Sequence, residues 1–312
     1  MSIARFYPIG TPGVPWGDSD KVAWRERQVR SRSYQDDVVR RVQALADRFD
    51  VEQYGQLNYG GDVFPLLALK SKSWDPTRPV ALVTGGVHGY ETSGVLGALR
   101  FAETRAADYA DRVNVIVVPC VSPWAYERVC RWNFHAVDPN RQFGAQRGAE
   151  ESSALIALLE PHAGKFLVHI DLHETTDTDA SEFQPAKAAR DGQPHHSEEI
   201  PDGFYLVGDS ETSRLDFQEA IIAAVERVTH IAPPDAAGHI IGFPLSTRGV
   251  IEFPVRSSGL CASFTHAKFT TTTEVYPDSA RTNPEECVVA QPASAGAATG
   301  SMPCVQPGTS MK

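Results

Sequence analysis

The sequence predicts an α/β fold with a largely parallel β-sheet, because strand-like and helix-like segments alternate along the chain. Apolar runs of strand length alternate with segments of helical periodicity between residues 80 and 172. Such a β–α–β–α order is typical of a sheet that helices cover on both faces. With 312 residues, of which 42% are hydrophobic, the chain can bury one large core or two small ones.

The first elements follow an N-terminal lead-in, residues 1–32, which is rich in Gly, Pro and charge and is expected to be irregular. Residues 33–36 (Ser-Tyr-Gln-Asp) resemble a capping box with Asp in place of Glu. One apolar helix face is then expected from the spacing of Val38, Val42, Leu45 and Phe49. Two strands are expected around residues 51–56 and 62–70.

The alternating centre begins with the run of residues 80–84, which is bounded by Pro79 and a Gly-Gly pair. A continuous β-branched and apolar run of this length predicts a strand buried on both faces. The elements expected after it are a helix over residues 93–105, a strand over 113–119, a helix over 150–160 and a strand over 166–172.

The second half begins with a polar segment, residues 175–202, which is interpreted as a long loop near the functional site. Its acidic residues Asp177, Asp179 and Glu182 fit a polar loop. A helix over 215–228 and strands over 249–253 and 269–276 are expected next, the last being too rich in Thr for a helix. Residues 285–312 are rich in Ala, Ser, Gly and Pro, and a mobile tail is expected there.

Composition narrows the class of protein. The formal charge of −10 argues against a nucleic-acid or anionic-membrane partner. The five cysteines are odd in number and form no C-x-x-C motif, so reduced thiols are expected. Neither a signal peptide nor a membrane-spanning run is recognisable. A soluble cytoplasmic protein is expected, and the sequence does not indicate its oligomeric state.

Two motifs at strand ends predict a metal site. His88-Gly-Tyr-Glu91 follows the first buried strand, and His173 lies at the end of the strand that contains His169. Taken alone, H-x-x-E more often marks a solvated loop or helix edge than a metal site, and His173 more often a hydrogen-bonded histidine than a ligand. Ligands of such sheets bind at the carboxyl ends of strands, where both motifs fall. Two His and one Glu leave a position for water, as in a catalytic zinc site. His169, inside the apolar run, is expected to be a core histidine.

A third motif concentrates charge between Arg131 and Arg141. The segment Arg131-Trp-Asn-Phe-His-Ala-Val-Asp138-Pro-Asn140-Arg141 carries two guanidinium groups, an amide and a carboxylate. Arginine forks suit carboxylates and developing oxyanions. Without the metal motif, a surface loop with ordinary ion pairs would explain this segment.

Taken in order, these motifs resemble the zinc carboxypeptidase family of the carboxypeptidase A type. That family carries H-x-x-E, then R-x(6)-D-x-N-R, a third ligand histidine and a late catalytic glutamate. The resemblance implies a single domain with a central mixed, mostly parallel sheet flanked by helices, here over residues 33–284. It also implies one zinc ion, bound by His88, Glu91 and His173, and an Asp138 that orients His88.

The same resemblance implies the roles of the remaining site residues. Arg131 would stabilise the oxyanion, while Asn140 and Arg141 would hold the terminal carboxylate of the substrate. Glu274 resembles the catalytic glutamate, and Glu252 is the rival for this role. Glu174, next to a ligand, is expected to point to the other face of its strand.

The chain also departs from the carboxypeptidase pattern. Residues 249–273 contain no Tyr, although digestive members of the family have a substrate-contacting tyrosine before the glutamate; Tyr276 follows it here. Arg256 could either bind an acidic side chain of the substrate or be an ordinary surface arginine.

Three functions stay open from the sequence. A zinc metallocarboxypeptidase acting on a peptide with a free carboxylate is the first. Asp-Leu-His-Glu-Thr-Thr from Asp171 and Glu-Val-Tyr-Pro from Glu274 also resemble aspartoacylase and succinylglutamate desuccinylase, so an N-acyl amino acid deacylase is the second. A catalytically silent peptide-binding module is the third, although every ligand motif is present.

Overall fold

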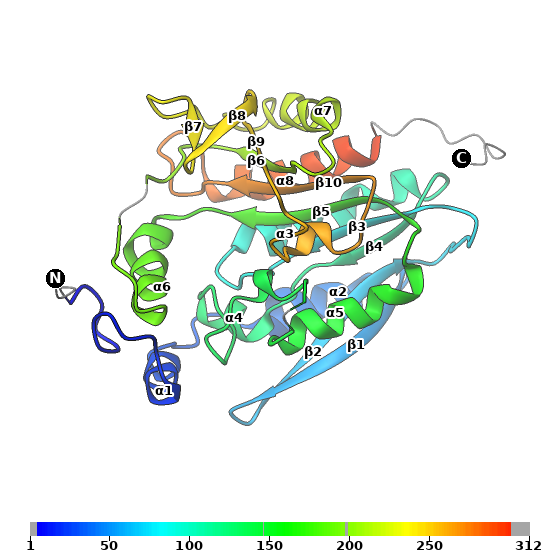
Figure 1. The fold of residues 1–312 in the computed structure, drawn as a ribbon. Helices are drawn as coiled ribbons and strands as arrows, with labels where there is room; N and C mark the ends of the chain where they lie inside the picture. Colours follow the sequence, from blue (N-terminus) through cyan, green and yellow to red (C-terminus); the bar gives the residue numbers. More distant parts are fainter. Residues whose placement is uncertain (1–4, 146, 197–198, 301–312) are drawn as a thin grey trace.

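The computed structural model describes residues 5–145, 147–196 and 199–300 (Figure 1). Within them, one ten-stranded sheet has the strand order β1-β2-β4-β3-β5-β10-β6-β9-β8-β7. The strands are β1 Phe49–Tyr59, β2 Asp62–Ser71, β3 Val80–Gly85, β4 Asn114–Val118, β5 Phe166–Glu174, β6 Tyr205–Asp209, β7 His239–Ile240, β8 Phe243–Thr247, β9 Val250–Phe253 and β10 Phe269–Val275.

The sheet is mixed, and its parallel part lies at the centre. Strands β4, β3, β5 and β10 pair in parallel, as do β6 and β9. The pairs β1–β2, β2–β4, β10–β6, β9–β8 and β8–β7 are antiparallel. The α/β fold class is therefore confirmed, with a larger antiparallel share than the sequence predicts. Two-residue turns produce part of it: Gly60 and Gly61, both with positive φ, close the β1–β2 hairpin.

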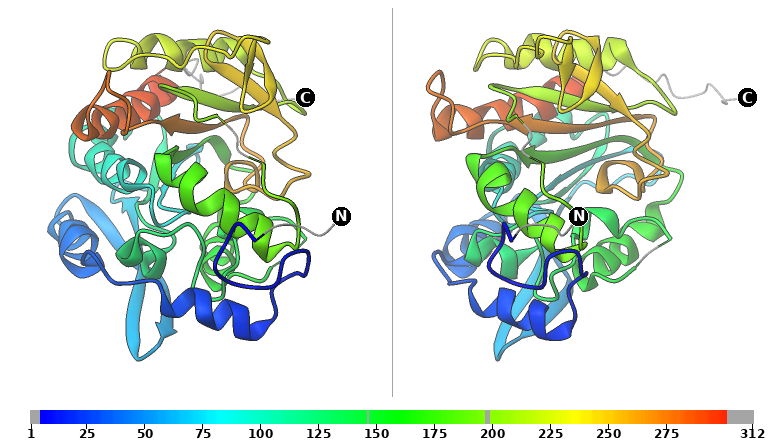
Figure 2. Two further views of the ribbon diagram at one scale, coloured as in Figure 1. Left: turned by 90° about the vertical axis from the view of Figure 1, so that its left-hand side faces the viewer. Right: turned by 60° about the vertical axis from the view of Figure 1, so that its left-hand side comes forward.

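Helices cover both faces of the sheet (Figures 1 and 2). The α-helices are α1 Asp18–Glu26, α2 Arg40–Ala44, α3 Thr92–Thr104, α4 Pro123–Arg128, α5 Glu150–Leu159, α6 Gln184–Arg190, α7 Leu215–Val225 and α8 Pro284–Gly300. Short 3-10 or π turns are η1 Gln35–Val39, η2 Ala106–Tyr109, η3 Pro139–Arg141, η4 Glu160–His162, η5 Asp179–Phe183 and η6 Cys261–Ser263.

Strand β3 shows why the centre needs two covering layers. All its residues are buried, as the sequence predicts. Ala81 and Val83 belong to the core that includes α3, whereas Val80 and Leu82 belong to a second core that includes α5. Alternate side chains of a strand point to opposite faces, so an apolar residue at every position needs a helix on each side.

The two ends of the chain differ from expectation. The lead-in contains α1, because Trp24 is buried against Trp132 and anchors the helix to the domain. The expected tail is helical over α8, which packs against α3 and α7. Alanine favours helix, and Gly97 allows close packing, since a Cβ there would lie 2.3 Å from Gln291 Cβ. Residues 301–312 lie outside the described part.

Two interior segments also differ. The first expected helix is split into η1 and α2 and ends at Ala44, so Phe49 opens β1 instead. The Ser33 hydroxyl does accept a hydrogen bond from the Asp36 amide, at 3.1 Å, as a capping residue should. The segment 175–202 is not wholly loop: η5 and α6 form there.

Two expectations from composition can be compared with the described residues. Cys120, Cys130, Cys261 and Cys287 are buried and free, as expected, and Cys304 lies outside the described part. None of the helices described is both long and apolar enough to cross a membrane.

Candidate metal centre and its cavity

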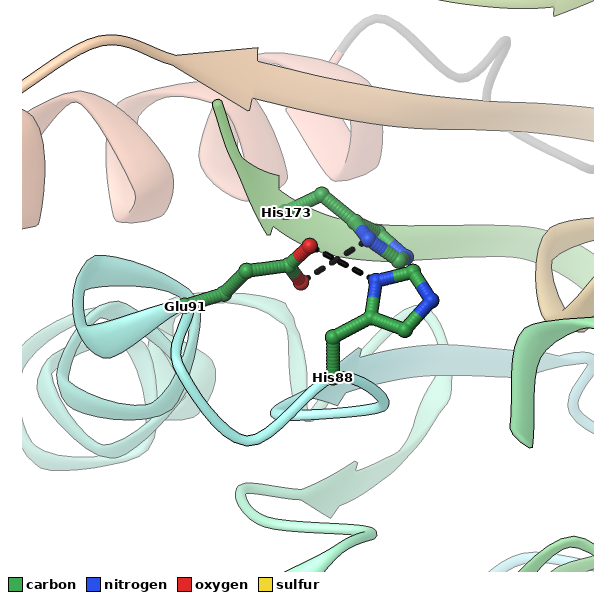
Figure 3. Close-up of side chains that lie close together, drawn as sticks. All are labelled: His88, Glu91 and His173. Carbon is green, nitrogen blue, oxygen red and sulfur yellow. Dashed lines mark hydrogen bonds and ion pairs between the residues drawn. The ribbon is translucent and has the colours of Figure 1, made fainter. Parts of the chain in front are cut away.

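Three buried side chains converge at the carboxyl ends of β3 and β5 (Figure 3). His88 follows β3, Glu91 precedes α3 and His173 lies near the end of β5. Each is about 1% exposed. The Nδ1 atoms of both rings face the Glu91 carboxylate, at 2.7 Å from His88 to Oε1 and 2.9 Å from His173 to Oε2. The pairing of β3 with β5 in parallel brings the three together, as the sequence predicts.

The loop that carries His88 and Glu91 is held against α4 and by Arg32. A Cβ on Gly89 would lie 2.0 Å from the Ala125 carbonyl carbon, so only glycine fits this approach. Arg32 donates to the Gly89 carbonyl at 2.9 Å and to Thr92 Oγ1 at 2.7 Å. The metal-site loop is thus fixed by a residue from the N-terminal lead-in.

The second nitrogen of each imidazole meets an aspartate. His88 Nε2 lies 3.0 Å from Asp138 Oδ1, at the position expected for the orienting carboxylate. His173 Nε2 lies 2.7 Å from Asp171 Oδ2, and Thr84 donates to the other oxygen of Asp171 at 2.6 Å. Such carboxylate partners set the tautomer that leaves Nδ1 free as a ligand. The sequence motifs do not indicate a role for Asp171 as the orienting carboxylate of His173, although its spacing of two from His173 places both on one face of a strand.

The three converging residues fit a zinc ion. Their ligand atoms lie within 4.8 Å of one another. Glu91 Oε2 is buried and has no aligned hydrogen-bond donor, which is costly unless the atom serves as a ligand. Burial raises the pKa of Glu91, but the charges of His173 and His88 outweigh it and lower that pKa to about 2. Two imidazoles and a carboxylate are the donor set of catalytic zinc sites with one open position.

Glu274 lies on the strand next to His173. Strand β10 pairs in parallel with β5, with Glu274 opposite His173, so both side chains point to the same face. Glu274 lines the same cavity as His88 and His173, and its Oε2 accepts a hydrogen bond from Thr175 at 3.0 Å. Burial raises the pKa of Glu274 to about 8.

The rival glutamate points elsewhere. On β9, Ile251 and Phe253 line the cavity, and Glu252 between them does not. Its carboxylate accepts a hydrogen bond from Ser246 instead, at 3.1 Å. Alternation along a strand explains the difference.

Arg131 is surrounded by hydrogen-bonding and aromatic partners. Its Nε lies 3.3 Å from Asp138 Oδ2, and its Nη1 donates to the Tyr90 hydroxyl at 3.0 Å. Tyr90 in turn donates to Asp179 at 2.7 Å, and the guanidinium lies 4.2 Å from the Phe183 ring centre. Asp179, expected in a polar loop, is therefore buried beside the site; its sequence context holds no signal that distinguishes it from Asp177.

Asn140 and Arg141 line the cavity next to Asp138. Asn140 Oδ1 accepts a hydrogen bond from the Cys261 amide at 2.7 Å. Arg141 Nη1 donates to the Asn140 carbonyl at 2.9 Å, and no carboxylate of the described residues lies within ion-pair distance of Arg141. Its charge is therefore available to an anion that enters the cavity.

The remaining candidates lie around or outside this cavity. Arg256 does not line it and pairs with Asp209 at 3.0 Å. Glu174 accepts a hydrogen bond from the amide of Ser93 at 2.7 Å, and it still lines part of the cavity together with His173. His169 is the expected core histidine, and burial lowers its pKa to about 4.

The cavity has two unlike sides. One side is built by residues of the segments 174–196 and 199–201, so the described part of the excursion expected near the site does lie there, with Asp179, Phe183 and Lys187 among its lining residues. The other side is built by β6, β9 and β10. The tyrosines that line it are Tyr90 and Tyr205, whereas the Tyr276 hydroxyl pairs with Asp177.

Comparison with solved structures identifies the fold. A candidate metallopeptidase from Shewanella amazonensis SB2B is 19% identical with a TM-score of 0.63, over 86% of this chain and 91% of that chain. A metallo-carboxypeptidase from Burkholderia cenocepacia is 14% identical with a TM-score of 0.57, over 92% and 69%. The metallo-carboxypeptidase from Pseudomonas aeruginosa in complex with (2-guanidinoethylmercapto)succinic acid is 14% identical with a TM-score of 0.55, over 84% and 67%.

The chain therefore has a metallo-carboxypeptidase-like fold, as the motifs predict. No family model matches the sequence, and no curated protein sequence does.

Proposed function

We propose that this chain is a zinc-dependent metallocarboxypeptidase that hydrolyses the C-terminal amide bond of a peptide or small peptide-like substrate. The observation that carries the proposal is the shared cavity. It contains His88 and His173 with Nδ1 turned toward Glu91, and Glu274 beside them on the neighbouring strand. A candidate metal site, a partly buried carboxylate and an arginine in one cavity are the parts that amide hydrolysis by activated water requires.

The protein's part of the reaction follows from these positions. His88, Glu91 and His173 would hold a zinc ion, which would supply a Lewis acid that polarises the scissile carbonyl and lowers the pKa of bound water to about 7. Glu274 accepts the proton of the attacking water and returns it to the leaving amine. Burial raises the pKa of Glu274 above the usual range of a glutamate, toward the range in which a group can both take up and release a proton near neutral pH.

Two arginines bind two different negatively charged groups of the reacting substrate. Arg131, fixed by Asp138 and Tyr90, donates to the developing oxyanion. Arg141 and Asn140 bind the terminal carboxylate, because Arg141 has no acidic partner among the described residues. Substrates are thus restricted to those with a free carboxylate, and neither nucleic acid nor a membrane is a partner.

The N-acyl amino acid deacylase is the second candidate. A carboxylate clamp beside a zinc site serves an N-acyl amino acid as well as a peptide, since both end in an amide followed by a free carboxylate. The segments at Asp171 and Glu274 that resemble the deacylases favour this alternative. A silent binding module is third, because every group that the chemistry needs is present.

Two substrate sets distinguish these candidates. Zinc-loaded protein is incubated with short peptides and with N-acetyl and N-succinyl amino acids, and amino-acid release is followed by mass spectrometry. Release from peptides, and its absence from the same peptides with an amidated C-terminus, is expected. Release from the N-acyl amino acids alone would assign the deacylase, and release from neither set would contradict both hydrolases.

A further inference from the structure

We infer that the residue carrying the free carboxylate must have an apolar side chain, because the cavity beside Glu274 ends in an uncharged wall. This inference rests on the proposed function and names its substrate class. The wall consists of Val207, Phe243, Ile251, Phe253 and Leu260, all of which line the cavity. We refer to these five residues as the apolar wall.

Strand register places the wall next to the catalytic row. Thr272 lies two residues before Glu274 on β10, so both point to the same face of the sheet. Thr272 pairs with Val207 on β6, and Val207 pairs with Ile251 on β9. Paired residues of neighbouring strands share a face of the sheet. The row of side chains that starts at Thr272 on β10 therefore continues with apolar residues, Val207 on β6 and Ile251 on β9.

The wall is well packed. Ile251 is 1% exposed and Leu260 is 8% exposed. The rings of Phe243 and Phe253 meet edge to face with centroids 5.2 Å apart. A side chain that enters this end of the cavity therefore meets carbon atoms in a fixed arrangement.

Charged groups near the wall neutralise each other outside the cavity. Asp209 lies two residues after Val207 on the same face of β6, is 2% exposed and pairs with Arg256 at 3.0 Å. Neither residue lines the cavity. A charged terminal side chain would lose its hydration against the apolar wall and gain no partner there.

The wall borders the proposed carboxylate clamp. The amide of Cys261, the residue after Leu260, donates to Asn140 Oδ1 at 2.7 Å, and Phe143 donates to the Gly259 carbonyl at 3.1 Å. These bonds tie the segment of Leu260 to the segment of Arg141. A substrate whose carboxylate meets Arg141 would direct the side chain of the same residue toward Leu260.

Charged side chains on the side of the cavity opposite the apolar wall offer competing selections, since Asp191 and Glu199 line the cavity as well as a lysine. Lys187 on α6 also lines the cavity and is exposed. It would favour an acidic terminal residue if the substrate side chain pointed toward α6 instead of the sheet. The experiment must therefore distinguish a preference for an apolar terminal residue, assigned to the apolar wall, from a preference for an acidic one, assigned to Lys187.

The test measures kcat/KM of zinc-loaded protein for N-acyl dipeptides that differ only in the last residue: Phe, Leu, Lys, Glu or Gly. Phe or Leu is expected to exceed Lys and Glu by about tenfold or more. Val207→Asp should lower the value for Phe and raise that for Lys, while the similar-sized Val207→Thr should keep the wild-type order. Circular dichroism checks that both variants fold.

Equal or higher values for Lys or Glu would overturn the inference, and a preference for Glu that Lys187→Met abolishes would assign selection to Lys187. If no dipeptide is hydrolysed, the proposed function fails. The selectivity of the apolar wall is then tested separately, by the binding of free amino acids. Calorimetry with free L-Phe, L-Leu, L-Lys and L-Glu should then show tighter binding of the first two. Equal affinities, or no binding of any of the four, would overturn the apolar selection.

Discussion

At the scale of single residues, the site consists of three polar side chains whose possible ligand atoms converge: the Nδ1 atoms of His88 and His173 and the carboxylate of Glu91. Asp138 and Asp171 each occupy the outer nitrogen of one ligand histidine, and Glu91 lies between the inner ones. His88, Glu91 and His173 are each about 1% exposed, so little water competes for their inner atoms. The arrangement is costly without a cation, and we interpret it as prepared for one.

Replacing Glu274 by Gln should separate metal binding from turnover. The amide keeps the shape of the side chain but cannot accept the proton of water, so kcat should fall by about two to four decades while zinc is retained. Steady-state kinetics and metal analysis of the same preparation check both effects. Glu252→Gln is the matched control and should retain wild-type turnover; if it is the variant that loses activity, Glu252 is the base.

The aspartate behind His173 should control zinc affinity. Asp171→Asn removes the charge that holds His173 Nε2, and zinc affinity should fall by about 10- to 100-fold. Competition with a chromogenic chelator measures the change. Asp177→Asn, at an exposed position near the same cavity, is the control. An unchanged affinity in Asp171→Asn would show that this carboxylate does not support the ligand.

At the scale of elements, the metal loop depends on a segment distant in sequence. Arg32 reaches the Gly89 carbonyl and Thr92 with two arms of one guanidinium, and it stacks on Tyr126 with 4.0 Å to the ring centre. Figure 2 shows the N-terminal segment passing beside α6, where Tyr7 and Trp16 make hydrogen bonds to Glu182 and Arg190. The lead-in is thus part of the framework of the site.

Arg32→Lys tests this dependence. A lysine has the charge but not the planar fork, so the loop loses directed hydrogen bonds and the protein should lose about 1–3 kcal/mol of unfolding free energy. Denaturant unfolding measures the loss. Arg40→Lys, in an exposed ion pair with Asp36, should change stability by no more than about 0.5 kcal/mol. Equal effects of the two substitutions would contradict the role of Arg32.

Sequence patterns predict the elements of this chain best where one physical signal dominates. The all-apolar run at β3 and the strand-end motifs of His88 and His173 led to the correct strands and to the convergence of the ligands. Patterns fail where long-range packing decides: α8 reads as a tail because small residues carry no periodicity, and Asp179 reads as loop because only the fold brings it to Arg131. Asp171 was predictable from its spacing to His173.

At the scale of the whole molecule, the sheet joins three hydrophobic clusters, and the fold buries several carboxylates. Glu151 is 1% exposed near the 131–141 segment, where Asn133 donates to it at 3.3 Å. Burial raises the pKa of Glu151 to about 7. The folded protein therefore holds the proton of Glu151 more tightly than the unfolded chain, whose glutamates titrate near ~4.3.

This shift gives stability a defined pH dependence. An acid with a raised folded pKa contributes stability below the unfolded pKa and loses it as pH rises through about 7. Glu151→Gln should therefore be more stable than wild type at pH ~8, by on the order of 2–3 kcal/mol, with little difference at pH ~4. Denaturant unfolding at both pH values tests this, with the exposed Glu150→Gln as control; the same effect of Glu151→Gln at both would contradict the assignment.

The most direct test of the account is the zinc content of the purified protein after loading and extensive dialysis, measured by plasma mass spectrometry. One zinc ion per chain is predicted for wild type, and none for the variant with both His88→Ala and His173→Ala. A folded wild-type protein that gains no zinc, or a double variant that retains it, would contradict the metal site on which the proposed function depends.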